Sequence, residues 1–356
     1  MGVDRRSFIK MSGAAVAAAA TVRGAEKQSP GWRAGSRINP AVDNLRVVCC
    51  HDPSMVTSSC EEMPGFAKME VQNGAVSVER VQKNLDAMAL ALTQKSSPAD
   101  AWAVLLRKPR DKPWDKVRAA IKVNSIADNH PRLAVVDKIC RELNALGVSM
   151  ENIVIYDGCH NAHQHYAAYV GKGLPEGVQV SEKSSLLGGT TEAQTPSPDN
   201  GAYDCSADVA TGAIDILVNC AVNKGHGQKF GGATLTMKNH FGTFTPQPHG
   251  HGDLDYVLAI NKSDAIVGGE PARQQLCIVD SLWASTHGPR GIPNKDTHRL
   301  VMGVFGPAVD YLTIKKIREP IMGAEHNEEA LRRFATEFGY EPAAFEKAEL
   351  VEVKPA

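Results

Sequence analysis

The chain has 356 residues, of which 43% are hydrophobic, and a formal net charge of −1. This length is enough for one large α/β domain, and the balanced charge argues against nucleic acid or an anionic membrane surface as a partner. None of the eight cysteines forms a C-x-x-C pair, which excludes a ferredoxin-type iron–sulfur motif and a zinc ribbon.

The N-terminus has the pattern of an export signal. Arg5 and Arg6 are followed by two apolar residues, a lysine and an alanine-rich run that ends at Ala20. This pattern is typical of a twin-arginine signal peptide, here residues 1–25, and the alternative is an ordinary basic N-terminus. It predicts the twin-arginine export machinery as a partner and a periplasmic or otherwise exported location. The apolar run is too short for a stable membrane span, which takes roughly 20 residues.

The rest of the chain is predicted to form a linker at residues 26–42 and a single α/β domain at residues 43–345. A strand is expected at 45–50, and the spacing of apolar residues predicts helices at 78–93 and 98–106. The clearest unit is a strand at 117–124, a helix at 131–146 and a strand at 152–157. This order predicts a βαβ unit with parallel strands.

Further strands are expected at 214–220, 276–280 and 300–305, and further helices at 307–317 and 328–338. Residues 186–207 are expected to be irregular, and residues 225–252 to form a Gly/His-rich loop insertion. The predicted fold class is therefore α/β, with a mostly parallel central sheet and helices on both faces.

Polar residues follow the ends of the predicted strands. Lys122 and Asn124 close one strand and Asp157 follows the next, while Asn219, Asn223, Lys224 and His226 follow the third and Asp280 the fourth. The carboxyl ends of parallel strands share one edge of a sheet, and ligands bind there. These residues should therefore converge on one crevice, provided that the third and fourth strands are parallel to the first two.

The chemistry of this set favours a small anionic ligand. Lys122, Lys224 and Lys238 offer cationic donors, and His226 offers a general base or a metal ligand. Asp157 and Asp280 either orient these groups or simply cap a helix or turn. The predicted catalytic residues are Lys122, Lys224, His226 and Asp280, and the predicted substrate-binding residues are Asn124, Asp157, Asn219, Lys238 and Asn239.

A transition-metal site is a second hypothesis. His160 and His163 are three residues apart, so in a helix they share one face and are candidate metal ligands. His226 is a third candidate ligand. The structural alternative is a polar start of a helix near solvent. The sequence has no phosphate-binding loop, no dinucleotide fingerprint and no G-x-S-x-G elbow, which argues against nucleotide hydrolysis, dinucleotide binding and esterase chemistry.

Several segments in order resemble a known family. Residues 121–124 (IKVN) resemble its strand ending in K-P-N, residues 217–227 its I-N-x-P-K-x-K-x-H-G stretch, and residues 234–242 its T-x-x-x-K-N-x-x-G helix. Residues 278–280 with 288–291 and residues 307–310 resemble two further segments. Over residues 98–324 the chain resembles domain of unknown function 362, which implies an α/β fold and leaves the activity open.

Three functional hypotheses follow. The first is an enzyme on a small anionic substrate, an oxidoreductase or isomerase rather than a hydrolase, because no activated nucleophile is visible. The second is a non-catalytic metal- or ligand-binding protein of the cell envelope. The third is a partner that matures a cofactor for an exported oxidoreductase.

Overall fold

The computed structural model describes residues 31–356 apart from 64, 67, 183–184 and 247–252. The predicted signal peptide, residues 1–25, lies outside the described residues. Within them, no helix is long and apolar enough to cross a bilayer.

Within the described residues, eight strands form one sheet in the order β12-β1-β11-β10-β7-β2-β3-β4. Their bounds are β1 (Val47–His51), β2 (Ala119–Val123), β3 (Ile153–Tyr156), β4 (Gln179–Val180), β7 (Ile216–Val222), β10 (Gln274–Ala284), β11 (Lys295–Gly303) and β12 (Leu350–Val353). Strands β10, β7, β2, β3 and β4 are parallel to one another, and β11 is antiparallel to its two neighbours. The prediction of a mostly parallel α/β sheet is confirmed.

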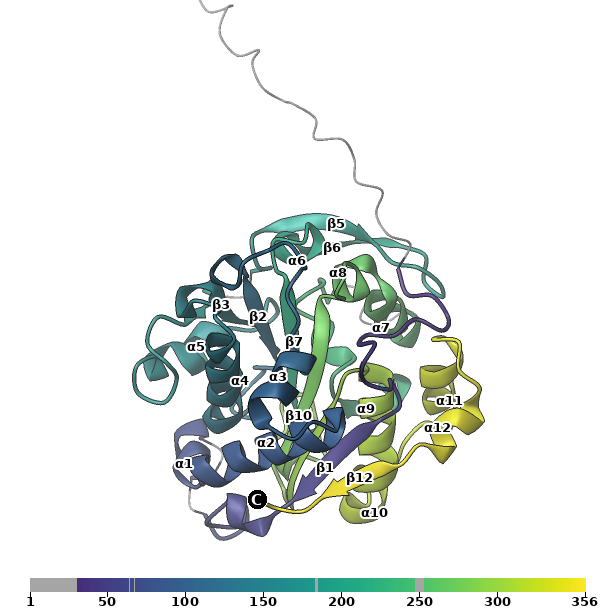
Figure 1. The fold of residues 1–356 in the computed structure, drawn as a ribbon. Coiled ribbons are helices and arrows are strands. Elements are labelled where there is room, and N and C mark those ends of the chain that lie inside the picture. The colour runs from purple at the N-terminus through teal and green to yellow at the C-terminus, as the bar shows by residue number, and fades with distance from the viewer. Residues whose placement is uncertain (1–30, 64, 67, 183–184, 247–252) are drawn as a thin grey trace, which may run out of the picture.

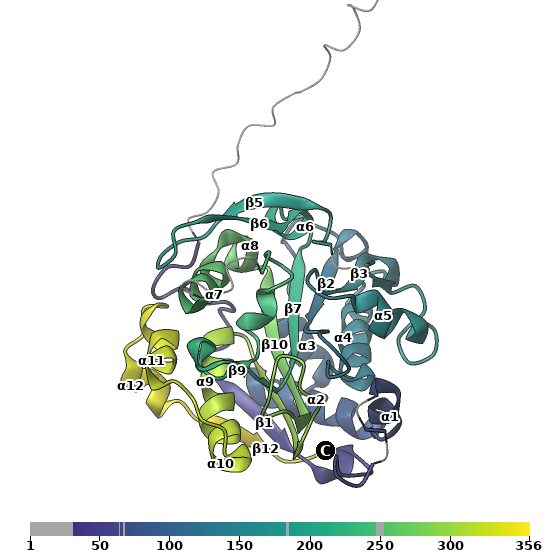
Figure 2. The same cartoon turned by 180° about the vertical axis from the view of Figure 1, so that it is seen from behind.

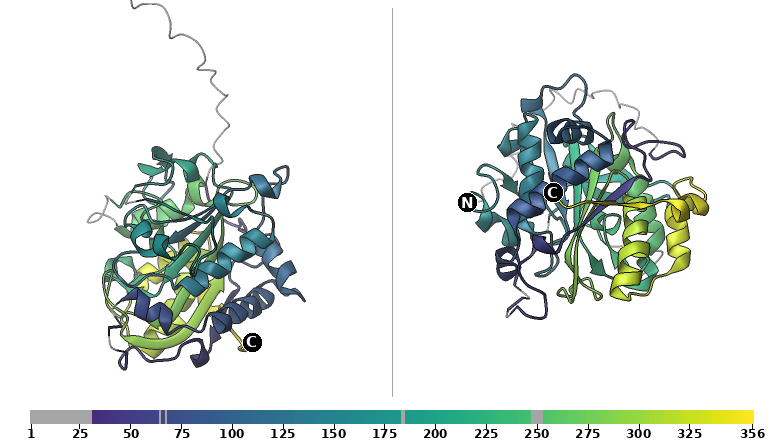
Figure 3. Two further views of the ribbon diagram at one scale, coloured as in Figure 1. Left: turned by 90° about the vertical axis from the view of Figure 1, so that its left-hand side faces the viewer. Right: turned by 60° about the horizontal axis from the view of Figure 1, so that its bottom comes forward.

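Helices pack on both faces of this sheet (Figures 1, 2 and 3). One face carries α2 and α4, and the opposite face carries α9. The helices are α1 (Met69–Gly74), α2 (Val78–Thr93), α3 (Pro98–Leu105), α4 (Leu133–Ala145), α5 (Ala162–Tyr166), α6 (Ala207–Ala210), α7 (Asp253–Lys262), α8 (Asp264–Val267), α9 (Gly306–Thr313), α10 (Glu319–Met322), α11 (Glu328–Thr336) and α12 (Pro342–Lys347).

The predicted βαβ unit is present as β2, α4 and β3. All five residues of β2 are buried, which fits a central strand that is covered on both faces. Helix α4 buries an apolar face that includes Val136, Ile139 and Leu143. Gly147 follows it with φ of 107°, a left-handed conformation that glycine adopts without strain, so the helix ends close to the expected residue 146.

One expectation for the chain outside the sheet was wrong. Residues 186–207 were expected to be irregular, but β5 (Thr190–Gln194) and β6 (Ala202–Ser206) form an antiparallel hairpin at one end of the molecule, at the top of Figure 1. Their many polar residues hid this pairing. In the expected loop insertion, β8 (Lys224–Gly225) and β9 (Ala233–Thr234) form a short hairpin, and residues 247–252 lie outside the described residues.

The described part of the expected linker, residues 31–42, packs onto the domain. The Trp32 side chain is 8% exposed, its indole N–H donates to the carbonyl of Phe338 at 3.0 Å, and its ring stacks on Phe305. At the other end of the chain, β12 adds an edge strand beyond residue 345. Both segments therefore belong to the folded domain.

Candidate functional site

A cavity of about 330 Å³ lies at the carboxyl ends of the parallel strands. Its wall comes from the segments that follow β2 and β3, from the stretch between β7 and α7, and from the loop between β10 and β11. The lining residues are Asn124, Ile126, Asp157, Cys159, His160, His226, Thr234, Lys238, Asn239, Phe241, Pro246 and Pro289. The cavity thus brings together residues more than 100 positions apart, because β2, β3 and β7 are parallel and end at the same edge of the sheet.

Lys122 and Asp157 form a buried ion pair beneath this cavity. The Lys122 ammonium lies 3.3 Å from an Asp157 carboxylate oxygen, and the two side chains are 0% and 2% exposed. It also donates to the Val123 carbonyl at 2.7 Å and to the Asn239 side-chain oxygen at 3.1 Å. An ammonium has three hydrogens, so these three contacts occupy all of them.

The Asp157 carboxylate lines the cavity and also fixes the adjoining backbone. One oxygen accepts from the Ser125 N–H at 2.8 Å, and the other accepts from the Cys159 N–H at 3.1 Å. Asp157 therefore joins the segments that follow β2 and β3. Asp157 thus accepts hydrogen bonds from the turn, as one interpretation of the sequence expected, and it also lines the cavity.

The side-chain amides of Asn239 and Asn219 form a hydrogen-bond network beside the cavity. The Asn239 side-chain nitrogen donates to the Lys122 carbonyl at 3.0 Å and to the Asn219 side-chain oxygen at 2.8 Å. Asn219 in turn donates to the Thr236 carbonyl and to Gln274. These contacts hold the Asn219 amide against Asn239, and Asn219 is not among the residues that line the described cavity wall, so its substrate-binding role stays a prediction.

Lys224 lies just behind the wall and is fully buried. Its ammonium donates to the carbonyls of Asn124 at 3.3 Å and Ile126 at 3.0 Å, both from the wall. Burial lowers the pKa of Lys224 to about 7, against the opposing charge of Asp157. This amine therefore holds the segment after β2 in place, and its charge changes near neutral pH.

Lys238 is the lysine of the described cavity wall, and it is 8% exposed. Its ammonium lies 3.9 Å from the ring centroid of Phe241 and 4.4 Å from that of Phe230, so it faces two aromatic rings. It belongs to a short 3-10 helix, Lys238–His240. A cation held in an apolar wall is a strong point of attraction for an anion, because water screens it little.

Asp310 of α9 fixes the backbone from which Lys238 projects. Its carboxylate accepts from the Thr236 N–H at 2.8 Å, the Thr236 hydroxyl at 2.5 Å and the Met237 N–H at 2.9 Å. The pKa of Asp310 is raised to about 7, because the effect of burial is larger than the opposing effect of these hydrogen bonds. The carboxylate thus satisfies backbone donors at the start of the turn that carries Lys238 and Asn239.

His160 and His226 both line the cavity, whereas His163 is outside the described wall. Burial lowers the pKa of His160, so its neutral form is favoured. The His226 and Phe230 rings pack in a T-shaped arrangement, with their centroids 4.5 Å apart. In the described part of the chain, no three His, Cys, Asp or Glu side chains are grouped so that they could hold a metal ion.

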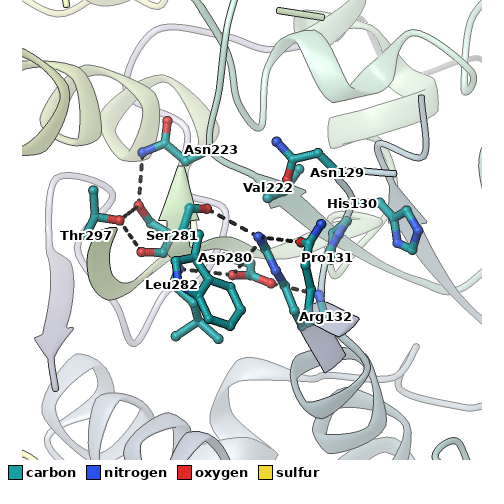
Figure 4. Close-up of polar contacts among 12 residues, drawn as sticks. Asn129, His130, Pro131, Arg132, Val222, Asn223, Asp280, Ser281, Leu282 and Thr297 are labelled. Atoms are coloured by element: carbon teal, nitrogen blue, oxygen red, sulfur yellow. Dashed lines mark hydrogen bonds and ion pairs between the residues drawn. The ribbon is translucent and has the colours of Figure 1, made fainter. Parts of the chain in front are cut away.

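Asp280 lies outside the described cavity wall and forms a second buried ion pair, with Arg132 (Figure 4). The Arg132 guanidinium lies 3.2 Å from one carboxylate oxygen, and the Arg132 backbone N–H donates to the other at 2.7 Å. Both side chains are 0% exposed. Asp280 therefore joins β10 to the start of α4, and its predicted catalytic role stays a prediction.

Sequence reasoning missed three residues of this region. Arg132 stands at the start of an apolar helix, where an unexplained buried cation was the available signal. Asp310 was noted only within a family segment. Thr234 lines the cavity but carries no distinctive sequence signal, because a lone threonine in a short strand is ordinary.

Comparison with known proteins gives a family and no characterised relative. No curated protein and no solved structure matches the chain. The model of the family described as "Domain of unknown function (DUF362)" matches residues 120–315, which is more than half of the 356 residues. This span runs from β2 to the end of α9 and includes every residue that lines the cavity. The chain belongs to the family of domain of unknown function 362.

Proposed function

We propose that the cavity binds a small anion and that Lys238 is its principal electrostatic partner. The observation that carries this proposal is a lysine side chain, 8% exposed, in the wall of a 330 Å³ cavity at the carboxyl ends of parallel strands. Asn124, Asn239 and Thr234 add polar groups to the same wall. A few polar groups in a mostly apolar, concave wall are typical of small-molecule sites.

Among the described residues of the wall, no cysteine is an activated nucleophile. Burial raises the pKa of the Cys159 thiol to about 12, so the thiol is protonated at neutral pH. A thiol is a poor nucleophile compared with its thiolate. If the bound anion is transformed, His160, His226 and the Asp157 carboxylate are the groups of the wall that can move a proton, which favours an isomerase or oxidoreductase over a hydrolase.

Replacing Lys238 by methionine is expected to weaken anion binding by more than tenfold. The change removes the ammonium and retains an apolar stem of similar length, and losing one partner of a buried charged hydrogen bond costs about 2–5 kcal/mol. Isothermal titration calorimetry of the full chain with benzoate, acetate and inorganic phosphate measures this loss.

Lys229→Met is the matched control, because Lys229 is exposed and lies 5.5 Å from the same Phe230 ring. Its affinity for each anion should stay within about twofold of the original chain. The proposal is wrong if the original chain binds none of the three anions, or if Lys238→Met binds them equally well.

Export of the folded chain is the second part of the proposal, supported by Arg5, Arg6 and the alanine-rich run after them. Cell fractionation should find the chain in the periplasm, and the double variant Arg5→Lys, Arg6→Lys should leave it in the cytoplasm. An unchanged distribution would contradict a twin-arginine signal.

A further inference from the structure

One hydroxyl in the cavity wall lacks a hydrogen-bond partner. Thr234 is 6% exposed, and its Oγ1 atom is buried with no partner among the residues that the structure describes. The pairing of Thr234 with Lys224 across the β8–β9 hairpin fixes its backbone. A buried hydroxyl without a partner costs free energy, and a polar atom of this kind in a cavity wall indicates a ligand or a water that completes it.

Nearby threonines show what this region does with buried hydroxyls. Thr236, two residues later, donates to Asp310, and Thr243 pairs with the Tyr156 hydroxyl at 2.7 Å. Thr234 differs from both in that it is one of the residues that line the cavity. The position is therefore suited to a hydrogen bond with something that the cavity holds.

The rest of the wall indicates the body of that ligand. Ile126, Phe241, Pro246 and Pro289 present apolar side chains to the cavity. Its volume is close to the lower end of the range of about 300–1,000 Å³ for small-molecule sites. A compact ligand with an apolar body fits this wall better than a hydrated inorganic ion, because apolar surface gains from leaving water.

The charges of the site favour a single negative charge. Lys238 lies in the wall, and the Lys122 ammonium contacts Val123, Asn239 and Asp157. Asp157 also lines the cavity, and its carboxylate repels a second negative charge. A dianionic phosphate would meet this repulsion more strongly than a monocarboxylate.

We infer that the cavity selects a monocarboxylate with a compact apolar body, and that the Thr234 hydroxyl donates to its carboxylate together with Lys238. This inference rests on the proposed anion binding and adds the substrate class and a specificity-determining residue. The apolar side chains of the wall, which include Ile126 and Pro289, then contact the body of the ligand.

Thr234→Val tests the role of the hydroxyl, because valine keeps the shape of threonine and removes only its polar group. Calorimetry on the full chain should show benzoate binding weakened by about tenfold, the usual effect of losing a hydrogen bond to a charged group. The thermal unfolding midpoint should not fall, because Oγ1 has no protein partner to lose among the described residues. Thr234→Ser, which retains the hydroxyl, should bind benzoate within about threefold of the original chain.

Three probes separate this inference from the proposed function. Benzoate should bind more tightly than acetate, which has the same charge and little body, and more tightly than inorganic phosphate. Phosphate or acetate binding as tightly as benzoate would overturn the substrate class while leaving anion binding intact. Equal benzoate affinity for Thr234→Val and the original chain would overturn the role of Thr234. Failure of all three anions to bind would instead remove the proposed function itself.

Discussion

Replacing Asp280 by asparagine is expected to lower the free energy of unfolding by about 3–5 kcal/mol. The change keeps the shape of the side chain and removes its charge, which leaves the Arg132 guanidinium buried without a counter-ion. Both side chains are 0% exposed, so water cannot replace the lost partner. Urea unfolding followed by circular dichroism measures the loss.

The contacts around Arg132 explain why the pair matters for the fold. Besides Asp280, its guanidinium donates to the Gln72 side-chain oxygen at 3.0 Å and lies 5.4 Å from the Trp283 ring centroid. The pair thus joins α1, α4 and β10, whose segments are far apart in the sequence. On the other side of β10, the Asn223 amide and Thr297 meet the Ser281 hydroxyl (Figure 4).

A double-mutant cycle isolates the charge interaction from the change in packing. The double variant Arg132→Met, Asp280→Leu should be more stable than the single variant Arg132→Met or Asp280→Leu, because it leaves no unpaired charge. Asp115→Asn is the control, since Asp115 is 61% exposed beside Lys116 and should change stability by less than about 1 kcal/mol. A loss below 1 kcal/mol for Asp280→Asn would show that the pair is not essential to the fold.

Replacing Lys122 by methionine should be about as destabilising, again by roughly 3–5 kcal/mol. It leaves the Asp157 carboxylate without its cationic partner and removes the donor to Asn239. Because Asp157 lines the cavity, benzoate affinity should fall as well, through repulsion by the uncompensated charge. Urea unfolding and calorimetry report the two effects separately.

Lys83→Met provides the matched control for this substitution. Lys83 pairs with Glu79 one helical turn away on α2, and the two side chains are 58% and 79% exposed. Such exposed pairs contribute about 0.3–0.5 kcal/mol. If Lys122→Met and Lys83→Met changed the unfolding free energy equally, Lys122 would not be part of a structural ion pair.

The parallel sheet and the convergence of polar residues could be predicted because both follow from short-range patterns. Apolar runs at 117–124, 152–157 and 214–220 identified three of the parallel strands, and the direction of parallel strands placed their polar ends together. Six of the predicted site residues line the cavity: Asn124, Asp157, His160, His226, Lys238 and Asn239.

The sequence could not show which of these residues line the cavity and which form structural contacts, because this depends on partners far away in the sequence. Asp280 looks like any strand-end carboxylate until Arg132, 148 positions away, is found against it. Lys122 and Lys224 look like ligand-binding lysines in the sequence, but in the structure both ammonium groups donate to oxygen atoms of the protein. The β5–β6 hairpin was missed because its polar residues give no apolar alternation.

The most direct test of the account is a crystal structure of the full chain with 4-bromobenzoate, whose bromine can be located by anomalous scattering. We expect the carboxylate within hydrogen-bonding distance of the Lys238 ammonium and the Thr234 hydroxyl, and the ring against Phe241 and Ile126. A carboxylate bound elsewhere on the protein, with the cavity holding only water, would contradict it.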